Sequence, residues 1–288
     1  MNYELITILR RYYLIQEYLR PDTIEEAIQL KKKYKDCACY YAGGTQFNSE
    51  RNDAIEVLIS LENLALNQIE EKEDSVYIGA MTIVDTIATS NLLQKAKLTA
   101  LIQVAKNLGT PQIRNLATIG GNIAIHKASA DFVPCLLAYN AQLFIIKEDE
   151  TKDTVSLEEY IKNNCHDLIL SIIIPKISPN FHIAVEKHTR TSIDLATVNI
   201  AVSFNIEEKI IRNLIIAVGS VSAYPKRLYN VENAFNNTSI ENYTVEQCEP
   251  IVAQHIEPIS DVRGSAEFKK YLCKIYIADA IKKCIQEQ

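Results

Sequence analysis

The sequence predicts an α+β protein of two domains, with a two-lobed first domain and a smaller second domain of antiparallel strands and helices. Three observations predict this class. The chain opens as strand, helix and strand before a Gly-Gly pair, and a second Gly-Gly pair follows a later helix pattern. Beyond residue 179 the pattern changes to adjacent strands and a final helix. At 288 residues the chain is long enough for two cores.

The first lobe is predicted to span about residues 1–62. Residues 13–20 form a strand, and 21–23 begin a helix whose first turn holds Glu25 and Glu26, where acidic groups favour the helix dipole. The helix runs to about residue 34, and the strands 38–42 and 56–60 complete the lobe.

The second lobe is predicted to span residues 63–175. It has strands at 76–80, 142–147 and 168–174, a helix from about 98 to 108 and a short helix near 131–139. The first domain is therefore expected to cover residues 1–175.

The second domain is predicted to cover residues 176–288, because the prolines in 175–179 mark a boundary. Strands at 182–187, 197–206 and 210–218 form an antiparallel meander with a charged turn at 207–209. A helix from 265 towards 285 closes the chain. Its predicted apolar face consists of Phe268, Tyr271, Leu272, Ile275 and Ala278.

Composition and charge exclude several function classes. The net charge of −6 argues against nucleic-acid binding, and the basic run 31–33 is interpreted as an exposed helix surface. No apolar stretch approaches the ~20 residues that span a bilayer. Glu4, Arg10 and Arg11 interrupt the N-terminal apolar segment and no small-residue cleavage site follows, so no secretory signal is predicted and a cytoplasmic location is expected.

The seven cysteines form no C-x-x-C pair and are scattered along the chain. Iron–sulfur and zinc sites need about four ligands at paired spacing. We therefore predict reduced structural thiols and no metal site.

Half of the eight glycines lie in the pairs Gly43-Gly44 and Gly120-Gly121. Adjacent glycines allow positive φ and bring bare N–H groups close to an anion, so two such loops suit the two phosphates of a dinucleotide. Tight turns are the alternative for either pair alone. Neither the dinucleotide fingerprint G-x-G-x-x-G nor the P-loop G-x-x-x-x-G-K-[ST] is present.

Residues 112–123 read QIRNLATIGGNI and resemble the QIRN-x-ATIGGNI segment of the FAD-binding subunits of molybdenum hydroxylases. These are the medium subunits of xanthine-dehydrogenase and carbon-monoxide-dehydrogenase-type enzymes. The resemblance covers about residues 12–288, and A-G-G-T-x-x-N at 42–48 is similar to a subgroup associated with selenium-dependent enzymes. Residues 46–51 depart from the family pattern. Further motifs in the family's order lie at 18–27, 42–45, 78–82, 129–134 and 260–268.

The resemblance implies a p-cresol-methylhydroxylase (vanillyl-oxidase) type FAD domain of two lobes, followed by a carbon-monoxide-dehydrogenase-flavoprotein-like domain. It implies that residues 42–47 hold the pyrophosphate through N–H groups, that Thr118 and Asn122 add side-chain hydrogen bonds, and that Asp131 lies near the ribityl–isoalloxazine region. The implied cofactor residues are Ala42, Gly43, Gly44, Thr45, Gln46, Phe47, Leu108, Thr118, Ile119, Gly120, Gly121, Asn122, Asp131, Ile169 and Lys187.

Four of the neighbouring residues have alternative interpretations. Leu108 and Ile169 are equally well explained as core, because apolar residues are usually just buried. Lys187 fits an exposed strand as well as a flavin contact. Arg114 is either a structural ion-pair residue or a functional one, and His188 is interpreted as structural.

The resemblance implies an electron-transfer role. A large subunit with molybdenum-pterin hydroxylates the substrate, a small subunit with [2Fe-2S] clusters relays electrons, and FAD passes them to NAD⁺ or another acceptor. This role requires no catalytic acid or base here, because the flavin performs the redox chemistry. Two alternatives are a free-standing flavin oxidase of the same superfamily and an assembly subunit that has lost the flavin.

The FAD is predicted to be bound non-covalently, because neither glycine segment contains a His or Cys to which a flavin could be attached. Acid or heat should release all of the flavin, measured by its absorbance after the denatured protein is removed. Flavin that remains with the denatured chain would contradict this prediction.

Overall fold

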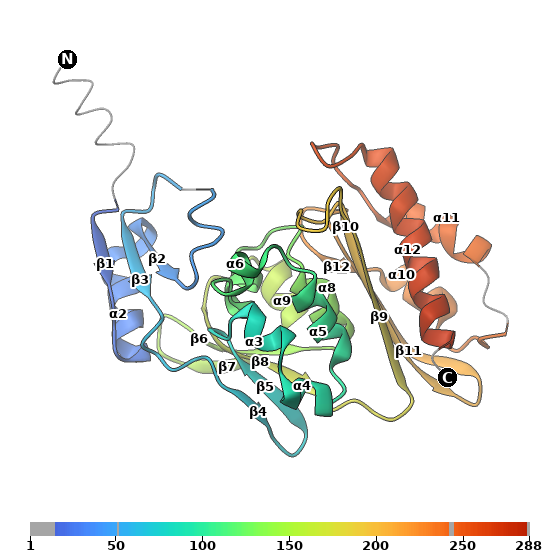
Figure 1. The fold of residues 1–288 in the computed structure, drawn as a ribbon, viewed down its shortest axis with the longest axis horizontal. Coiled ribbons are helices and arrows are strands. Elements are labelled where there is room, and N and C mark those ends of the chain that lie inside the picture. The colour runs from blue at the N-terminus through green and yellow to red at the C-terminus, as the bar shows by residue number, and fades with distance from the viewer. Residues whose placement is uncertain (1–14, 51, 242–244, 287–288) are drawn as a thin grey trace, which may run out of the picture.

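The computed structural model describes residues 15–50, 52–241 and 245–286, without side chains for 245–249. Three sheets follow one another along the molecule, from the N-terminal lobe on the left of Figure 1 to the C-terminal helices on the right. The predicted mixed architecture is confirmed. The N-terminal segment 1–14, for which no secretory signal is predicted, lies outside the described residues.

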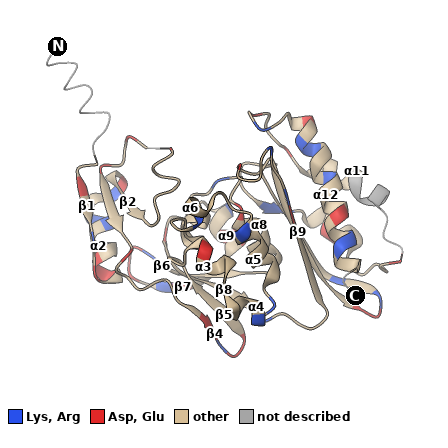
Figure 2. Ribbon diagram, in the orientation of Figure 1, with Lys and Arg blue, Asp and Glu red and all other residues tan. Residues whose placement is uncertain are grey.

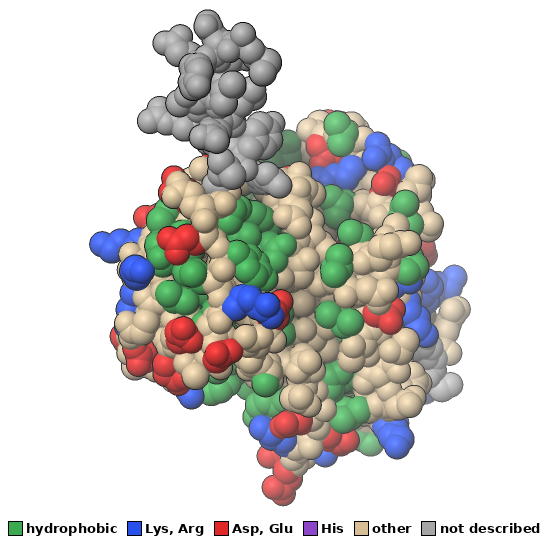
Figure 3. Space-filling view, turned by 60° about the vertical axis from the view of Figure 1, so that its left-hand side comes forward, with side chains coloured by type: hydrophobic (Ala, Val, Ile, Leu, Met, Phe, Trp, Pro, Cys, Tyr) green, Lys and Arg blue, Asp and Glu red, His purple; other side chains and the backbone are tan. Residues whose placement is uncertain are grey.

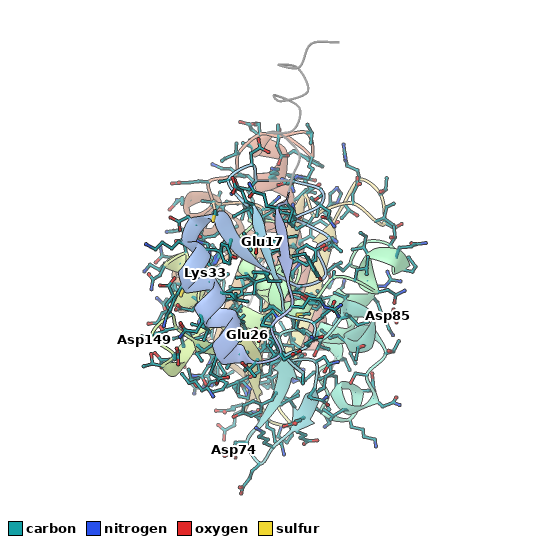
Figure 4. The ribbon with its side chains drawn as sticks, turned by 90° about the vertical axis from the view of Figure 1, so that its left-hand side faces the viewer. Glu17, Glu26, Lys33, Asp74, Asp85 and Asp149 are labelled. Atoms are coloured by element: carbon teal, nitrogen blue, oxygen red, sulfur yellow. The ribbon has the colours of Figure 1, made fainter. Side chains whose placement is uncertain are left out.

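The first lobe is a three-stranded parallel sheet covered by one helix. Its strands are β1 (Glu17–Leu19), β2 (Ala38–Tyr41) and β3 (Val57–Ser60), in the order β1-β3-β2. The helix α2 (Ile24–Tyr34) begins where the Thr23 hydroxyl accepts a hydrogen bond from the Glu26 N–H, and a 3₁₀ turn (Lys35–Cys37) follows it. Figure 4 looks onto the outer face of α2. The predicted first strand begins at residue 13, outside the described residues.

The second lobe is built around a five-stranded antiparallel sheet. Its strands are β4 (Ile69–Glu71), β5 (Ser75–Gly79), β6 (Gln142–Ile146), β7 (Lys152–Ser156) and β8 (Leu168–Pro175), in the order β4-β5-β8-β6-β7. The central strand β8 is mostly isoleucine and leucine because both of its faces are covered.

Short helices pack against this second sheet. They are α3 (Val84–Ala88), α4 (Asn91–Lys95), α5 (Thr99–Lys106), α6 (Pro111–Arg114), α7 (Ile119–Ala124), α8 (Phe132–Ala138) and α9 (Leu157–Lys162). All seven residues of α8 are buried, because α5 covers one side of it and strands of the C-terminal sheet cover another.

The C-terminal part contains the predicted meander. The strands β9 (Phe181–His188), β10 (Val198–Glu207) and β11 (Ile210–Gly219) pair antiparallel, and the short β12 (Lys226–Arg227) adds to β11. The helices α10 (Tyr229–Phe235), α11 (Val245–His255) and α12 (Ala266–Gln286) follow, and α12 packs on β9 and β10. Among the described residues, no helix is both long and apolar enough to cross a membrane.

The predicted apolar face of α12 is wrong at its first turns. Phe268 is 41 % exposed and Tyr271 is 58 % exposed, whereas Lys269 is 2 % exposed. The buried stripe is displaced by one residue from the predicted one. A lysine can occupy it because its ammonium has polar partners in the segment that precedes the helix. The buried residues are Lys269, Leu272, Cys273, Ile277, Ala278, Ala280, Ile281 and Cys284.

The ammonium of Lys269 lies 3.0 Å from a carboxylate oxygen of Asp261 and donates to the Ile259 carbonyl at 2.8 Å. Arg263 donates two further hydrogen bonds to the same carboxylate. Burial by itself would raise the pKa of Asp261, but the hydrogen bonds from Arg263 and Lys269 hold this pKa well below its usual range. These contacts fix the segment 259–264 against the helix.

Asp261→Asn should therefore destabilise the protein by about 2 kcal/mol at pH 7. Breaking a fully buried ion pair costs ~3–5 kcal/mol, and the cost is smaller here because the carboxylate is partly exposed. Urea denaturation would measure the loss. A depressed carboxyl pKa stabilises the fold above its unfolded value near 3.9 and loses this effect as the pH falls, so the difference from wild type should shrink below about pH 4. Asp261→Asn/Lys269→Met should cost less than Asp261→Asn alone, and an equal or larger cost would contradict the stranded-charge explanation.

Candidate functional site

The two glycine pairs lie side by side although about seventy-five residues separate them. A Cβ atom on Gly43 would lie 1.6 Å from the Leu116 carbonyl oxygen, so only a glycine permits this backbone-to-backbone contact. A Cβ atom on Gly121 would lie 4.0 Å from the Cβ of Ala42. The contact joins the first lobe to the segment that carries the second pair.

The first glycine segment follows β2 and turns sharply. Gly44 has a φ of +67°, which favours glycine, and residues 45–49 form successive turns. The Phe47 ring packs edge-on against Tyr41, with ring centroids 5.9 Å apart. No described residue accepts a hydrogen bond from the N–H groups of residues 43–47. These consecutive N–H groups are therefore available to an anion.

The second glycine pair lies in the first turn of the helix α7, whereas the sequence predicted a loop. Thr118 caps this helix, because its hydroxyl accepts from the Gly121 N–H at 3.1 Å. The Ile119 and Gly120 N–H groups bond to the carbonyls of Thr82 and Ala80. The N–H groups at this end of α7 are therefore used within the protein, which leaves anion binding to the first segment.

A cavity of about 310 Å³ opens between the two lobes beside both glycine segments. In Figure 3 hydrophobic side chains gather in the recess between the N-terminal lobe and the rest of the molecule. Its lining residues come from α2, β2, α7, α9 and β8 and the loops between them. They include Lys31, Cys39, Tyr40, Ala42, Leu61, Ala80, Met81, Gly120, Gly121, Ala124, Tyr160, His166, Asp167 and Ile169.

Three of the polar groups that line this cavity are neutral or already bonded within the protein. Burial raises the pKa of the Cys39 thiol to about 11, and burial also raises the pKa of the Tyr40 hydroxyl. The Lys31 ammonium donates to the Lys35 and Ala38 carbonyls at 2.8 and 2.9 Å. The cavity therefore suits a largely apolar, aromatic group with a charged group at the glycine end.

A second group of predicted residues lies where the C-terminal sheet meets the second lobe. The Lys187 ammonium lies 2.9 Å from a carboxylate oxygen of Asp131 and donates to the Asn107 carbonyl at 3.2 Å. Burial raises the pKa of Asp131, and the ammonium of Lys187 acts in the opposite direction. Both residues line a cavity of about 130 Å³.

Asn122 connects the two groups. Its side-chain oxygen accepts from the Phe132 N–H at 3.1 Å, immediately after Asp131, and no described residue accepts from its amide nitrogen. Asn122 itself lies in α7 beside Gly121. The helix of the second glycine pair therefore positions the Asp131 segment.

The structure brings the predicted residues into distinct positions. Four of them line the larger cavity: Ala42, Gly120, Gly121 and Ile169. Thr45, Gln46 and Phe47 form the adjoining turn. Leu108 is a core residue with 7 % exposure, one residue beyond the carbonyl that accepts from Lys187. Four other predicted residues belong to the two glycine segments but do not line the larger cavity. They are Gly43, Gly44, Thr118 and Ile119.

Sequence reasoning missed the polar residues of the cavity. Tyr40, Tyr160, His166 and Asp167 lie in no glycine motif, and only the tertiary contact of the lobes brings them together. Lys31 was interpreted as part of an exposed helix surface, but it is half-buried and lines the cavity. Its partners are carbonyls beyond the end of α2, which no spacing pattern reveals.

His188 and Arg114 have structural contacts. The Nδ1 atom of His188 shares a hydrogen bond of 3.0 Å with the Tyr276 hydroxyl, and the His188 ring packs edge-on against Phe268. One guanidinium nitrogen of Arg114 donates to the carbonyls of Lys106, Leu108 and Gly109. Arg114 therefore holds the end of α5, in agreement with its structural alternative.

Among the described residues, the six cysteines at 37, 39, 135, 165, 273 and 284 form no disulfide. Within the part of the chain that the structure describes, no three His, Cys, Asp or Glu side chains gather as a metal site.

Residues 13–177 match the family of FAD binding domains in molybdopterin dehydrogenases, and residues 183–284 match the CO dehydrogenase flavoprotein C-terminal domain. The chain is 31 % identical to the uncharacterized protein YgfM of Escherichia coli K12 over 95 % of this chain and 98 % of that protein. It is 29 % identical to the xanthine dehydrogenase FAD-binding subunit of Escherichia coli O157:H7, with 94 % of both chains covered.

The fold also matches a solved structure of carbon monoxide dehydrogenase from Hydrogenophaga pseudoflava. The TM-score is 0.87 at 26 % identity, with 94 % of this chain and 97 % of that chain covered. The fold and the paired glycine segments thus define a flavoprotein of the dehydrogenase class. The chain belongs to the family of FAD-binding subunits of molybdenum hydroxylases.

The residues present fit an FAD. The five open N–H groups of 43–47 suit its phosphates, and the absent side chain at Gly121 leaves space facing Ala42. Cβ atoms on Gly43 and Gly120 would collide with backbone. One on Gly121 would lie 2.9 Å from the Thr118 hydroxyl oxygen, a side-chain atom that has to shift, and 4.0 Å from the Cβ of Ala42. Gly121 is thus the glycine at which ligand binding and folding can be separated.

Gly121→Val should reduce FAD binding and leave most of the fold intact. The added side chain occupies the space facing Ala42, and a loss of about 1.4 kcal/mol or more corresponds to at least about tenfold in Kd. The ratio of flavin to protein absorbance would measure it, with circular dichroism as the check on folding.

Gly264→Ala is the matched control, because its Cβ would meet only the side chains of Phe268 and Thr197. Gly219 looks neutral in the sequence but is unsuitable, because a Cβ there would lie 2.2 Å from the Asn199 side-chain oxygen. Equal flavin content in Gly121→Val and wild type would contradict the assignment of the site.

Proposed function

We propose that this chain is the FAD-binding electron-transfer subunit of a molybdenum hydroxylase complex. It receives electrons from iron–sulfur clusters of a partner subunit and passes them through FAD to NAD⁺ or another acceptor. The observation that carries the proposal is the run of open N–H groups at 43–47 beside the space left by Gly121.

We also propose that the chain has two domains, with the bounds 1–175 and 176–288.

The residues of this site would have distinct roles. The N–H groups of 43–47 would bind the pyrophosphate, and the amide nitrogen of Asn122 is free to donate to the cofactor. The Thr118 hydroxyl oxygen caps α7, and its O–H group would donate a hydrogen bond to the cofactor. Asp131 and Lys187 would lie beside the flavin portion. Bound FAD would supply the one- and two-electron chemistry, so this chain's own residues bind, orient and exclude water.

The proposed partner subunits are inferred from the names of similar proteins. Similar proteins include the medium chain of carbon monoxide dehydrogenase and the FAD-subunit of nicotinate dehydrogenase. We propose a large molybdenum-binding subunit and a small [2Fe-2S] subunit. The described residues of this chain offer no cluster-ligand group, so electrons would reach the flavin from another protein. The cytoplasmic location remains a prediction.

An exposed apolar surface supports a protein partner. Two segments, 190–196 and 259–271, touch each other: Arg190 donates to the Val262 carbonyl and Arg263 to the Ala196 carbonyl. In Figure 1 they lie along the upper edge of the molecule. Clusters of exposed large apolar side chains mark interaction sites. This surface, the apolar rim, consists of Ile193, Leu195, Ile259, Val262, Phe268 and Tyr271.

The apolar rim and the Asp131–Lys187 pair lie on opposite faces of the C-terminal sheet. His188, which contacts Phe268, is the residue after Lys187, so the two side chains point to opposite faces of β9. Hydrogen bonding to Lys127 is the largest cause of the lowered pKa of Glu50, and the charge of Arg263 is the smallest, so Arg263 lies within electrostatic reach of the end of the first glycine segment. Two ion pairs flank the rim, Arg190 with Asp194 and Arg263 with Asp261. Figure 2 shows acidic and basic residues interspersed along α12. A neutral apolar surface fits a protein better than a charged small molecule.

Three measurements test the proposed function. An absorption spectrum of the purified chain with flavin bands would support FAD binding, and a colourless chain that binds no added FAD would favour the flavin-less assembly subunit. Co-purification of a molybdenum subunit and an iron–sulfur subunit would support the complex, whereas turnover of an organic substrate by the isolated chain would favour a free-standing oxidase. Anaerobic bleaching of the flavin by NADH would support NAD⁺ as the acceptor.

Val262→Asp should weaken assembly and leave FAD content unchanged. Val262 is 87 % exposed, so the substitution costs the isolated chain little but places a charge in an apolar interface. The amount of partner subunits that co-purifies with a tagged chain would measure the loss. Asn233→Asp, an exposed position on α10 with the same charge change, is the control. Unchanged co-purification of Val262→Asp would exclude the apolar rim as the interface.

A further inference from the structure

We infer that Asn199 is a positioning residue for the flavin site, through which the C-terminal sheet sets the place of the Asp131 carboxylate. The inference rests on the proposed function, because it takes Asp131 and Lys187 as groups beside the flavin. Neither Asn199 nor its partner Gly219 belongs to a sequence motif singled out for cofactor binding.

Asn199 stands in the middle of a row across the sheet. It lies directly opposite Lys187 of β9 on one side and opposite Gly219 of β11 on the other. Directly opposed residues point to the same face of a sheet. This face meets the segment that carries Asp131, because the Asn199 amide nitrogen donates to the Ala130 carbonyl at 3.1 Å.

Two asparagines thus bracket Asp131 from different parts of the chain. Asn199 binds the carbonyl before it, and Asn122 accepts from the N–H after it, each at 3.1 Å. The Ser220 N–H holds the Ala128 carbonyl at 2.7 Å, which fixes the same segment three residues earlier. With its neighbours held at both ends, the Asp131 carboxylate meets Lys187 in one geometry.

The amide of Asn199 has only one orientation in this position. Its nitrogen must face the Ala130 carbonyl, because only the NH₂ group can donate. Its buried oxygen then lies where a side chain on residue 219 would be, 2.2 Å from the position of an added Cβ, and has no hydrogen-bond partner among the described residues. Asn199 is 4 % exposed, so this oxygen is kept from water as well. A buried unpartnered acceptor is costly, and such costs are often retained where a group has a positioning role.

The test measures FAD affinity by the change in FAD fluorescence on binding, together with the midpoint potential of the bound flavin. Asn199→Ala should weaken FAD binding by about tenfold, the size of effect expected for a buried positioning hydrogen bond, and should shift the potential. Gly219→Ala should act in the same direction from the other strand. Asn199→Ser serves if Asn199→Ala does not fold.

Ser203→Ala is the matched control. Ser203 lies on the same strand, is equally buried and donates to the Ala138 carbonyl at 2.6 Å, at the far end of α8. Loss of this hydrogen bond should lower the stability measured in urea and leave the FAD affinity and the midpoint potential of the flavin as in wild type. If Asn199 had a purely structural role, Asn199→Ala would likewise lower stability and leave FAD affinity and potential unchanged.

A double-mutant cycle decides whether Asn199 acts through Asp131. In an Asp131→Asn background, Asn199→Ala should no longer weaken FAD binding. A folded Asn199→Ala with wild-type affinity and potential, or an equal loss in both backgrounds, would overturn the inference. If the wild-type chain binds no FAD, the proposed function itself fails, so the two failures are distinguishable.

Discussion

The backbone contact between Gly43 and Leu116 is the constraint on which the site depends. Any side chain at Gly43 would collide with the Leu116 carbonyl, so the two lobes can meet at this point only through a glycine. The contact places the open N–H groups of the first segment beside α7. Residues of both lobes line the cavity beside this contact. We propose that the dinucleotide binds between the lobes and not at the end of a single sheet.

The C-terminal sheet is a second determinant of the site. It contributes Lys187 to the ion pair and, through Asn199 and Ser220, holds the segment before Asp131. The same strands bury α8 completely. Under the proposed function, the C-terminal sheet would therefore be part of the flavin environment as well as a candidate surface for a partner. This arrangement explains why the positions flanking Asp131 are held so closely: a buried carboxylate is tolerated only where its partner is fixed.

Much of the fold could be predicted because its signals are local. The Thr23 cap and the acids after it begin α2, and the alternating residues of 181–219 form the meander. The stripe of α12 was mispredicted because Lys269 interrupts the apolar spacing, and its burial depends on Asp261 and on a carbonyl outside the helix. The second glycine pair was predicted as a loop because two glycines favour turns. Thr118, which caps the helix, and the carbonyls of Ala80 and Thr82 favour a helix instead.

The sequence by itself indicated the family through its motifs, and it located the two glycine segments and the antiparallel meander, because motifs, caps and periodicity act over a few residues. Only the tertiary structure decided which N–H groups remain open, which glycine has space beside it, and which polar residues share the cavity. Tyr160 and His166 meet Gly121 there, and Asn199 meets Ala130, through contacts between distant parts of the chain. Such contacts depend on the packing of whole lobes and sheets, which no local pattern of residues encodes.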